Sequence, residues 1–253
     1  MKSVAPPSRT PGLAGKPGAW VDLALTLPVF VGYHVGVVFL KIKNASDVVT
    51  GPLLALANGS RVNYIGITLG IGVVFAGIFA LLGRGQAFRT GKFVQIIIEG
   101  AVYAVAMRVG ASFIVGKLTL AAGAGSPAGG DPLTGLVMSL GAGFYEEIAF
   151  RVVLFGLGAK LLLFLFTKER MSLVTDGPRL GVRAFVLMAF WALAAAAVFS
   201  GVHYVGELGD SFAVGSFIFR LVLGLALTAI FATRGFAAAV WTHALYDAWV
   251  LVL

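Results

Sequence analysis

Seven long apolar runs constrain what this chain can fold into more than any other feature. They lie near residues 20–40, 64–83, 93–116, 134–166, 184–204, 214–232 and 236–253. A membrane-spanning helix needs about 20 mainly apolar residues, so six to eight such helices account for almost the whole chain. The sequence therefore predicts an all-α, polytopic bundle of about seven transmembrane helices, with eight as the alternative.

Composition supports one membrane-embedded domain. Of the 253 residues, 59% are hydrophobic and 12% are charged, and the mean hydropathy of +0.96 exceeds that of soluble domains. We expect a single domain over residues 20–253, with its motif-bearing core at about 134–250. Residues 1–19 contain four prolines and three basic residues, a pattern typical of a disordered basic arm. The first apolar run has no clear small-residue cleavage site, which favours a retained signal anchor.

The net charge of +8 comes from 19 Lys and Arg against 11 Asp and Glu. In a soluble protein this excess would suggest nucleic acid as a partner, but the basic residues here lie in loops between apolar runs. With the amino terminus inside, 11 basic residues fall in inner loops and 4 in outer loops. The bias predicts an N-in, C-out membrane protein that binds no nucleic acid. Cysteine is absent, which excludes disulfides and thiolate chemistry.

Glycines mark irregular places along the chain. The run 134–166 is too long for one straight span, and Gly141 with Gly143 predicts a helix that breaks before the two glutamates. Gly66 and Gly70 have the spacing of close helix packing in lipid. The apolar stretch 46–57 is too short to span and predicts an interfacial or re-entrant segment, and the glycine-rich residues 123–131 predict a loop.

Two adjacent carboxylates, Glu146 and Glu147, lie in an apolar run that also carries Arg151. Ionisable groups at bilayer depth cost about 2.5–3.5 kcal/mol each on insertion scales, so a chain keeps them for a partner or a task. On a helix, Glu147 and Arg151 share a face and form an ion pair, which leaves Glu146 available as a general base. The alternative is a purely structural ion pair that joins two helices.

Two further polar pairs have the same four-residue spacing. Phe199 and His203 end the fifth run, and His243 and Asp247 lie in the last run. A carboxylate beside an imidazole selects its tautomer and orients the ring. Each pair alone is compatible with a structural contact between helices. Together the three pairs use two of the three histidines of the chain, which favours a shared site.

Four other ionisable residues lie within apolar runs, and we expect structural roles for them: His34, Glu99, Arg108 and Arg220. His34 reads as an isolated ring in a helix contact. Arg220 is expected to pair with an acidic residue of a neighbouring helix. For Glu99 the alternative is that it reaches the active cavity from the third run.

The order Glu-Glu-x-x-x-Arg, Phe-x-x-x-His and His-x-x-x-Asp on successive membrane helices resembles the CAAX protease and bacteriocin-processing family. The resemblance covers roughly residues 134–250 and implies a glutamate-dependent intramembrane endopeptidase, related to the type II CAAX prenyl endopeptidases. It implies that Glu146 and His203 activate a water molecule and that His243 polarises the scissile carbonyl. Glu147 and Arg151 would keep their helix in place.

Asp247 departs from the pattern of better-known relatives, which often carry Asn at this position. An Asn donates a hydrogen bond to an oxyanion, whereas an ionised Asp only accepts. We therefore expect Asp247 to orient His243. The oxyanion then falls to His243, backbone groups or a protonated Asp247.

The expected chemistry needs no cofactor. Glu146, His203 and His243 also form a set that Zn²⁺ accepts, but no His-Glu-x-x-His helix is present to set the ligand spacing. Metal-free hydrolysis is favoured, and a zinc site on these three residues is the alternative.

We expect an integral membrane protein, located in a bacterial inner membrane on the basis of its Ala- and Gly-rich composition. Its expected partner is a membrane-anchored peptide or protein, such as a leader peptide or a C-terminal sorting tail. Two alternatives come from other classes. One is a scaffold or regulator that keeps the fold without proteolysis, and the other is a proton-coupled transporter. No inverted repeat supports transport.

Overall fold

The computed structural model describes residues 17–82, 90–118, 131–167, 181–206 and 209–252. In chain order its elements are α1 (Ala19–Ala24), α2 (Leu27–Leu40), α3 (Thr50–Leu56), α4 (Arg61–Leu82), α5 (Thr90–Leu118), α6 (Pro132–Gly141), the π-helix η1 (Ala142–Leu157), α7 (Gly158–Phe166), α8 (Val182–Val202), α9 (Val214–Arg234) and α10 (Phe236–Val252). These ranges contain no strand, so the all-α prediction is confirmed. The predicted arm up to residue 16 and almost all of the loop 123–131 lie outside the described residues.

Six segments are long and apolar enough to cross a membrane: Ala19–Leu40, Arg61–Leu81, Gly91–Ile114, Pro132–Phe166, Val182–Val202 and Val214–Arg234. They match six of the seven predicted spans. The short segment predicted at 46–57 contains the seven-residue helix α3. The chain is therefore a polytopic helical bundle.

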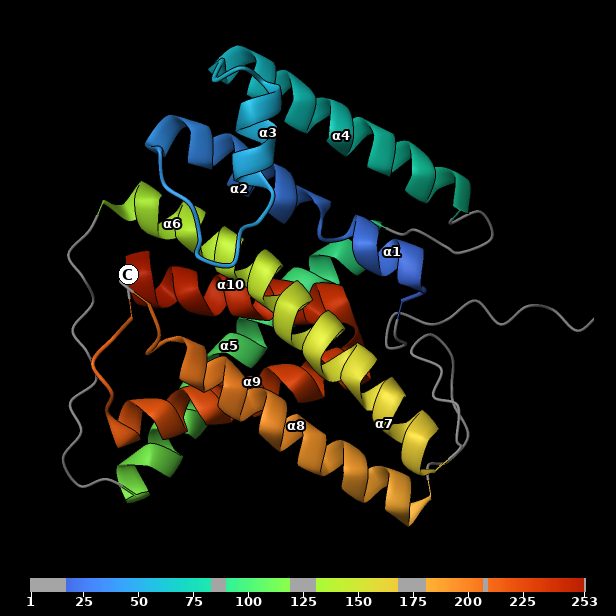
Figure 1. Cartoon of the computed structure of the whole chain (residues 1–253), viewed down its shortest axis with the longest axis vertical. Coiled ribbons are helices and arrows are strands. Elements are labelled where there is room, and N and C mark those ends of the chain that lie inside the picture. The colour runs from blue at the N-terminus through green and yellow to red at the C-terminus, as the bar shows by residue number, and fades with distance from the viewer. Residues whose placement is uncertain (1–16, 83–89, 119–130, 168–180, 207–208, 253) are drawn as a thin grey trace, which may run out of the picture.

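The seventh predicted span, α10, differs from the other six in length and position. It has 17 residues, about 25 Å at 1.5 Å per residue, which is less than the roughly 30 Å of a hydrocarbon core. It packs against α5, α6, η1 and α9 and lies in the middle of the molecule (Figure 1). Its surroundings are mainly other helices, so its apolar character serves the interior of the bundle.

The predicted helix break before the two glutamates is absent. The chain continues without interruption from Pro132 to Phe166, and at Ala142 the winding changes from α to π for 16 residues. π-Helical turns are rare and occur often at functional sites. The glycines thus accompany a change of winding rather than a break.

Glycines allow three elements to approach α10 closely. A Cβ on Gly143 would lie 2.7 Å from Ala244 Cβ and 2.8 Å from the Val240 carbonyl oxygen. Gly100 of α5 and Gly135 of α6 meet α10 in the same way. Small residues replace the hydrophobic effect as the means of packing helices in lipid. The predicted pair Gly66 and Gly70 does not do this, because a Cβ on either would have no atom of the described residues within 4 Å.

These contacts predict opposite effects for two identical substitutions. Gly143→Ala is expected to destabilise the protein by about 1–3 kcal/mol, because the added methyl group overpacks the contact with α10. Gly66→Ala, on an exposed helix face, is expected to stabilise by up to about 1 kcal/mol through helix propensity. Thermal unfolding in detergent checks both, and equal midpoints would contradict the packing role of Gly143.

A distant carboxylate sets the start of α10. Asp22 of α1 accepts hydrogen bonds from the backbone N–H groups of Phe236, at 2.6 Å, and Ala237, at 2.9 Å. Gly235, which precedes them, has φ of +104° and lies against the same carboxylate. A carboxylate at a helix N-terminus satisfies free N–H groups and complements the helix dipole. Asp22 therefore ties the first span to the helix that carries His243.

Candidate active site

The centre of the site is a buried contact among Glu147, Arg151 and His243. Glu147 Oε1 lies 3.0 Å from Arg151 Nη1 and 2.7 Å from His243 Nδ1, which donates to it. The side chains of Glu147 and Arg151 are 0% and 1% exposed. The expected four-residue ion pair is present, and the same carboxylate also reaches across to α10. Glu147 thereby links η1 to the histidine of the last helix.

His243 has the expected partner, Asp247, and a second one that was not expected, Glu147. Asp247 was expected to orient this ring, but its Oδ2 lies 3.4 Å from Nε2, whereas Glu147 holds Nδ1 at 2.7 Å. Nε2 also faces Glu146 Oε2 at 4.0 Å. A carboxylate bound to one ring nitrogen selects the tautomer and the ring orientation. Glu147 and Asp247 thus contact opposite nitrogens of the ring, and the orienting role expected of Asp247 stays a prediction.

The two carboxylate oxygens of Glu146 differ in their hydrogen bonding. Its Oε1 accepts a hydrogen bond of 3.3 Å from Asn44 Nδ2. Its Oε2 is buried and accepts no hydrogen bond from the described residues, and it lies toward His243. A buried carboxylate oxygen without a donor is costly. This oxygen therefore has the free lone pairs and the location that a base acting on a water molecule requires.

Phe199 connects the second histidine to the rest of the site. Its ring centroid lies 5.1 Å from that of His203 and 6.0 Å from that of His243. The guanidinium of Arg151 lies 4.3 Å above the same ring, the geometry of a cation–π contact. His203 Nδ1 donates to the Phe199 carbonyl oxygen at 2.8 Å. In the neutral ring Nε2 is then the nitrogen with a free lone pair.

All the residues singled out from the sequence for the site therefore lie in one cluster. They come from η1, the end of α8 and α10, namely Glu146, Glu147, Arg151, Phe199, His203, His243 and Asp247. The carboxyl-terminal ends of α2, α8 and α10 lie at the same end of the bundle, on the left in Figure 1.

Within the described ranges, no three His, Asp or Glu side chains are grouped closely enough to hold a metal ion.

The expectation that His34 is an isolated ring is wrong. Its Nε2 lies 2.6 Å from the Tyr145 hydroxyl and its Nδ1 lies 2.6 Å from the Tyr64 hydroxyl. The Tyr64 hydroxyl in turn donates to Thr50 Oγ1 at 3.3 Å. His34 is fully buried and joins α2, α3, α4 and η1. The expectation that it serves as a helix contact is therefore correct.

Asp47, between α2 and α3, ends this series of hydroxyl groups. It accepts hydrogen bonds from Tyr33 at 2.8 Å, from the Thr50 side chain, and from the N–H groups of Val49 and Thr50. Burial raises the pKa of a carboxyl, but here the hydrogen bonds outweigh burial and hold the pKa of Asp47 below its ordinary value. Its ionised form therefore adds stability above the unfolded pKa, about 4, and this stability is lost as the pH falls through the lower folded pKa.

Sequence reasoning missed Asn44, Tyr33 and Asp47 as neighbours of the site. Asn44 and Asp47 lie in the connection after α2 and Tyr33 lies within α2, all about 100 positions before Glu146. No local spacing relates them to Glu146. A signal was present in the polar residues that directly follow a long apolar run, but this pattern is also common at the ends of ordinary spans.

The other intramembrane charges have partners outside the site. Glu99 accepts from Arg234 at 2.8 and 3.0 Å, so the structural role expected for it is confirmed. Arg220 pairs with Asp210, which precedes α9 in an extended connection. The guanidinium of Arg108 lies 4.9 Å from the centre of the Trp249 ring.

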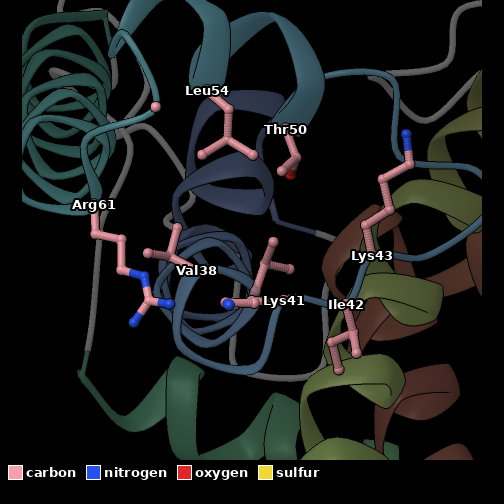
Figure 2. A pocket seen from close by; sticks show the side chains of 9 residues that line it. Val38, Lys41, Ile42, Lys43, Thr50, Leu54 and Arg61 are labelled. Atoms are coloured by element: carbon pink, nitrogen blue, oxygen red, sulfur yellow. The ribbon is translucent and has the colours of Figure 1, made fainter.

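A cavity of about 300 Å³ lies beside the site rather than in it. Figure 2 shows its lining at the end of α2, in the following connection, in α3 and at the start of α4. The lining is mainly apolar, with Lys41, Lys43 and Arg61 as its charged members. None of the clustered site residues contributes to it. The cavity therefore does not mark the place of the chemistry.

The fold and the site define a polytopic helical membrane protein with buried carboxylates, an arginine and imidazoles between its helices. Residues 128–249 match the family model described as type II CAAX prenyl endopeptidase Rce1-like. Over these residues the chain is similar to that family, so the resemblance predicted from its motifs is confirmed. The match supports a membrane protease that acts on a peptide or protein. No curated protein and no solved structure matches the chain.

Proposed function

We propose that the protein is an intramembrane endopeptidase that cuts a peptide bond near a membrane anchor. The observation that carries the proposal concerns Glu146 Oε2. This oxygen is buried, accepts no hydrogen bond from the described residues and lies 4.0 Å from His243 Nε2. Peptide hydrolysis needs a base for water and a donor for the developing oxyanion. A carboxylate oxygen without a donor supplies the base, and a protonated imidazole that faces it supplies the donor.

In the proposed reaction a water molecule attacks the scissile carbonyl carbon while its proton passes to Glu146. His203 accepts a hydrogen bond from the same water through its free Nε2. His243, protonated on both ring nitrogens, keeps its Nδ1 proton hydrogen-bonded to Glu147 and donates from Nε2 to the oxygen that becomes negative. The carbon–nitrogen bond then breaks, and the proton is delivered to the leaving amine. Glu147 and Arg151 hold η1 and the His243 ring in register during these steps. The reaction uses no metal ion.

We propose that the host is bacterial and that the protein lies in the inner membrane with its amino terminus inside. The orientation is supported by the 11 basic residues in inner loops against 4 in outer loops, and the bacterial host by the Ala- and Gly-rich composition. This orientation directs the ends of α2 and α8 outward. The substrate class that fits is a membrane-anchored leader peptide or C-terminal sorting tail.

The test compares membrane and secreted proteomes of host strains that carry wild type, Glu146→Ala or His203→Ala. We expect the same uncleaved precursor termini to accumulate in both variants, because each lacks a group that activates water. Synthetic peptides that span those termini then serve as substrates for the purified full chain in detergent. Two variants that express stably but leave the proteome unchanged would refute proteolysis and favour a scaffold.

A further inference from the structure

The hydrogen bond from Asn44 to Glu146 comes from outside the family-matched segment. Asn44 lies in the connection between α2 and α3, whereas the match begins at residue 128. It is 6% exposed, so its amide is withdrawn from solvent. A hydrogen bond from a buried amide to an ionised carboxylate is stronger than one between neutral groups, and it orients that carboxylate. The amino-terminal half of the chain thus reaches the proposed base.

The orientation of the Asn44 amide follows from its other contacts. The Ser46 N–H donates to Asn44 Oδ1 at 2.8 Å, so Oδ1 is the acceptor and Nδ2 is the group that faces Glu146. The backbone N–H of Asn44 donates to the Tyr33 hydroxyl at 2.8 Å, and that hydroxyl donates to Asp47. The Oδ1 atom and the backbone N–H of Asn44 thus have partners away from the site. Among the described residues, the partner of Nδ2 is Glu146 Oε1.

Packing holds the same residue in place. Gly141, at the end of α6, leaves room for both Tyr33 and Asn44, since a Cβ there would lie 2.3 Å from Tyr33 Cε2 and 3.1 Å from Asn44 Cβ. Asp47 anchors the connection through four hydrogen bonds. The support under Asn44 is therefore built from α2, the connection and α6.

We infer that Asn44 is a positioning residue for the catalytic base. This inference rests on the proposed function. The Asn44 Nδ2 group holds Glu146 Oε1 and thereby orients Oε2 toward His243 and the attacking water. Asn44 adds a neutral amide donor to a site where the carboxylates of Glu147 and Asp247 also lie near His243.

The test measures kcat and KM on a synthetic precursor peptide with the purified full chain. Asn44→Ala is expected to lower kcat about 10- to 100-fold, as loss of positioning does, while KM stays within about twofold. Asn44→Gln retains an amide donor and is expected to recover part of kcat. Asn63→Ala, at an exposed asparagine of α4, is the matched control and should keep the wild-type kcat.

Asn44→Asp gives a second readout that a purely structural role would not move. It has nearly the same shape but places a carboxylate against Glu146 and opposes its ionisation, so the acidic limb of the kcat profile should shift to higher pH. Asn63→Asp adds the same charge away from the site and should leave the profile unchanged. The other charged or titratable groups that act on Glu146 are Arg151, His203, His243 and Asp247. Glu147 follows it directly in the chain, and all five are common to all the variants.

The outcomes separate the inference from the function on which it rests. If wild type cleaves and Glu146→Ala does not, but both Asn44→Ala and Asn44→Asp match wild type, the inference is overturned and the proposed function stands. If Asn44→Ala is too unstable to assay, the pH profile of Asn44→Asp decides. If wild type and Glu146→Ala process the precursor equally, the proposed function fails and the inference fails with it.

Discussion

Glu146→Gln is expected to lower kcat by about 100- to 10,000-fold, the range that a general base contributes. Gln keeps the size of the side chain and still accepts from Asn44 at its carbonyl oxygen, so the fold should survive. What is lost is the carboxylate oxygen that takes the proton from water. The measurement is cleavage of the precursor peptide by the purified chain, together with thermal unfolding to show that the variant is folded.

Glu99→Gln is the matched control for this prediction. Glu99 is also a partly buried intramembrane carboxylate, but it pairs with Arg234 and should leave kcat near the wild-type value. A chelator added to wild type should also leave the rate unchanged, because the proposed reaction uses no metal ion. A rate that persists in Glu146→Gln would remove this residue from the role of base, and a rate that a chelator abolishes would favour a zinc site.

The second large effect is expected at Arg151. Arg151→Met leaves the fully buried Glu147 without its guanidinium and is expected to cost about 3–5 kcal/mol of stability, as for other broken buried pairs. His243 still donates to Glu147, so the loss should fall toward the lower end of this range. Thermal unfolding in detergent is the measurement, with a reduced yield of folded protein as a second sign.

Two further variants test the cause of that loss. Arg220→Met removes a partner of the exposed Asp210 and should cost no more than about 1 kcal/mol. Glu147→Gln combined with Arg151→Met removes both charges and should recover part of the loss. If the double variant is as unstable as the sum of the single variants, the pair does not act through its buried charge.

Residues close together along one helix were the easiest to place from sequence. Glu147 with Arg151, Phe199 with His203, and His243 with Asp247 each share a face, because side chains four positions apart on a helix are neighbours. The π winding of η1 did not disturb the first pair. The six long spans were equally predictable, since their length and apolarity follow from the thickness of the bilayer.

The sequence alone determined that this is an all-α membrane protein, six of its seven predicted spans, and which polar pairs lie on each helix. Only the tertiary structure decided that Glu147 also contacts His243, that Asn44 reaches Glu146, and that α10 lies at the centre of the bundle. The physical reason is that hydropathy and helical periodicity are local properties. How helices rotate and approach one another depends on close contacts, such as Gly143 against Ala244, that join residues about 100 positions apart.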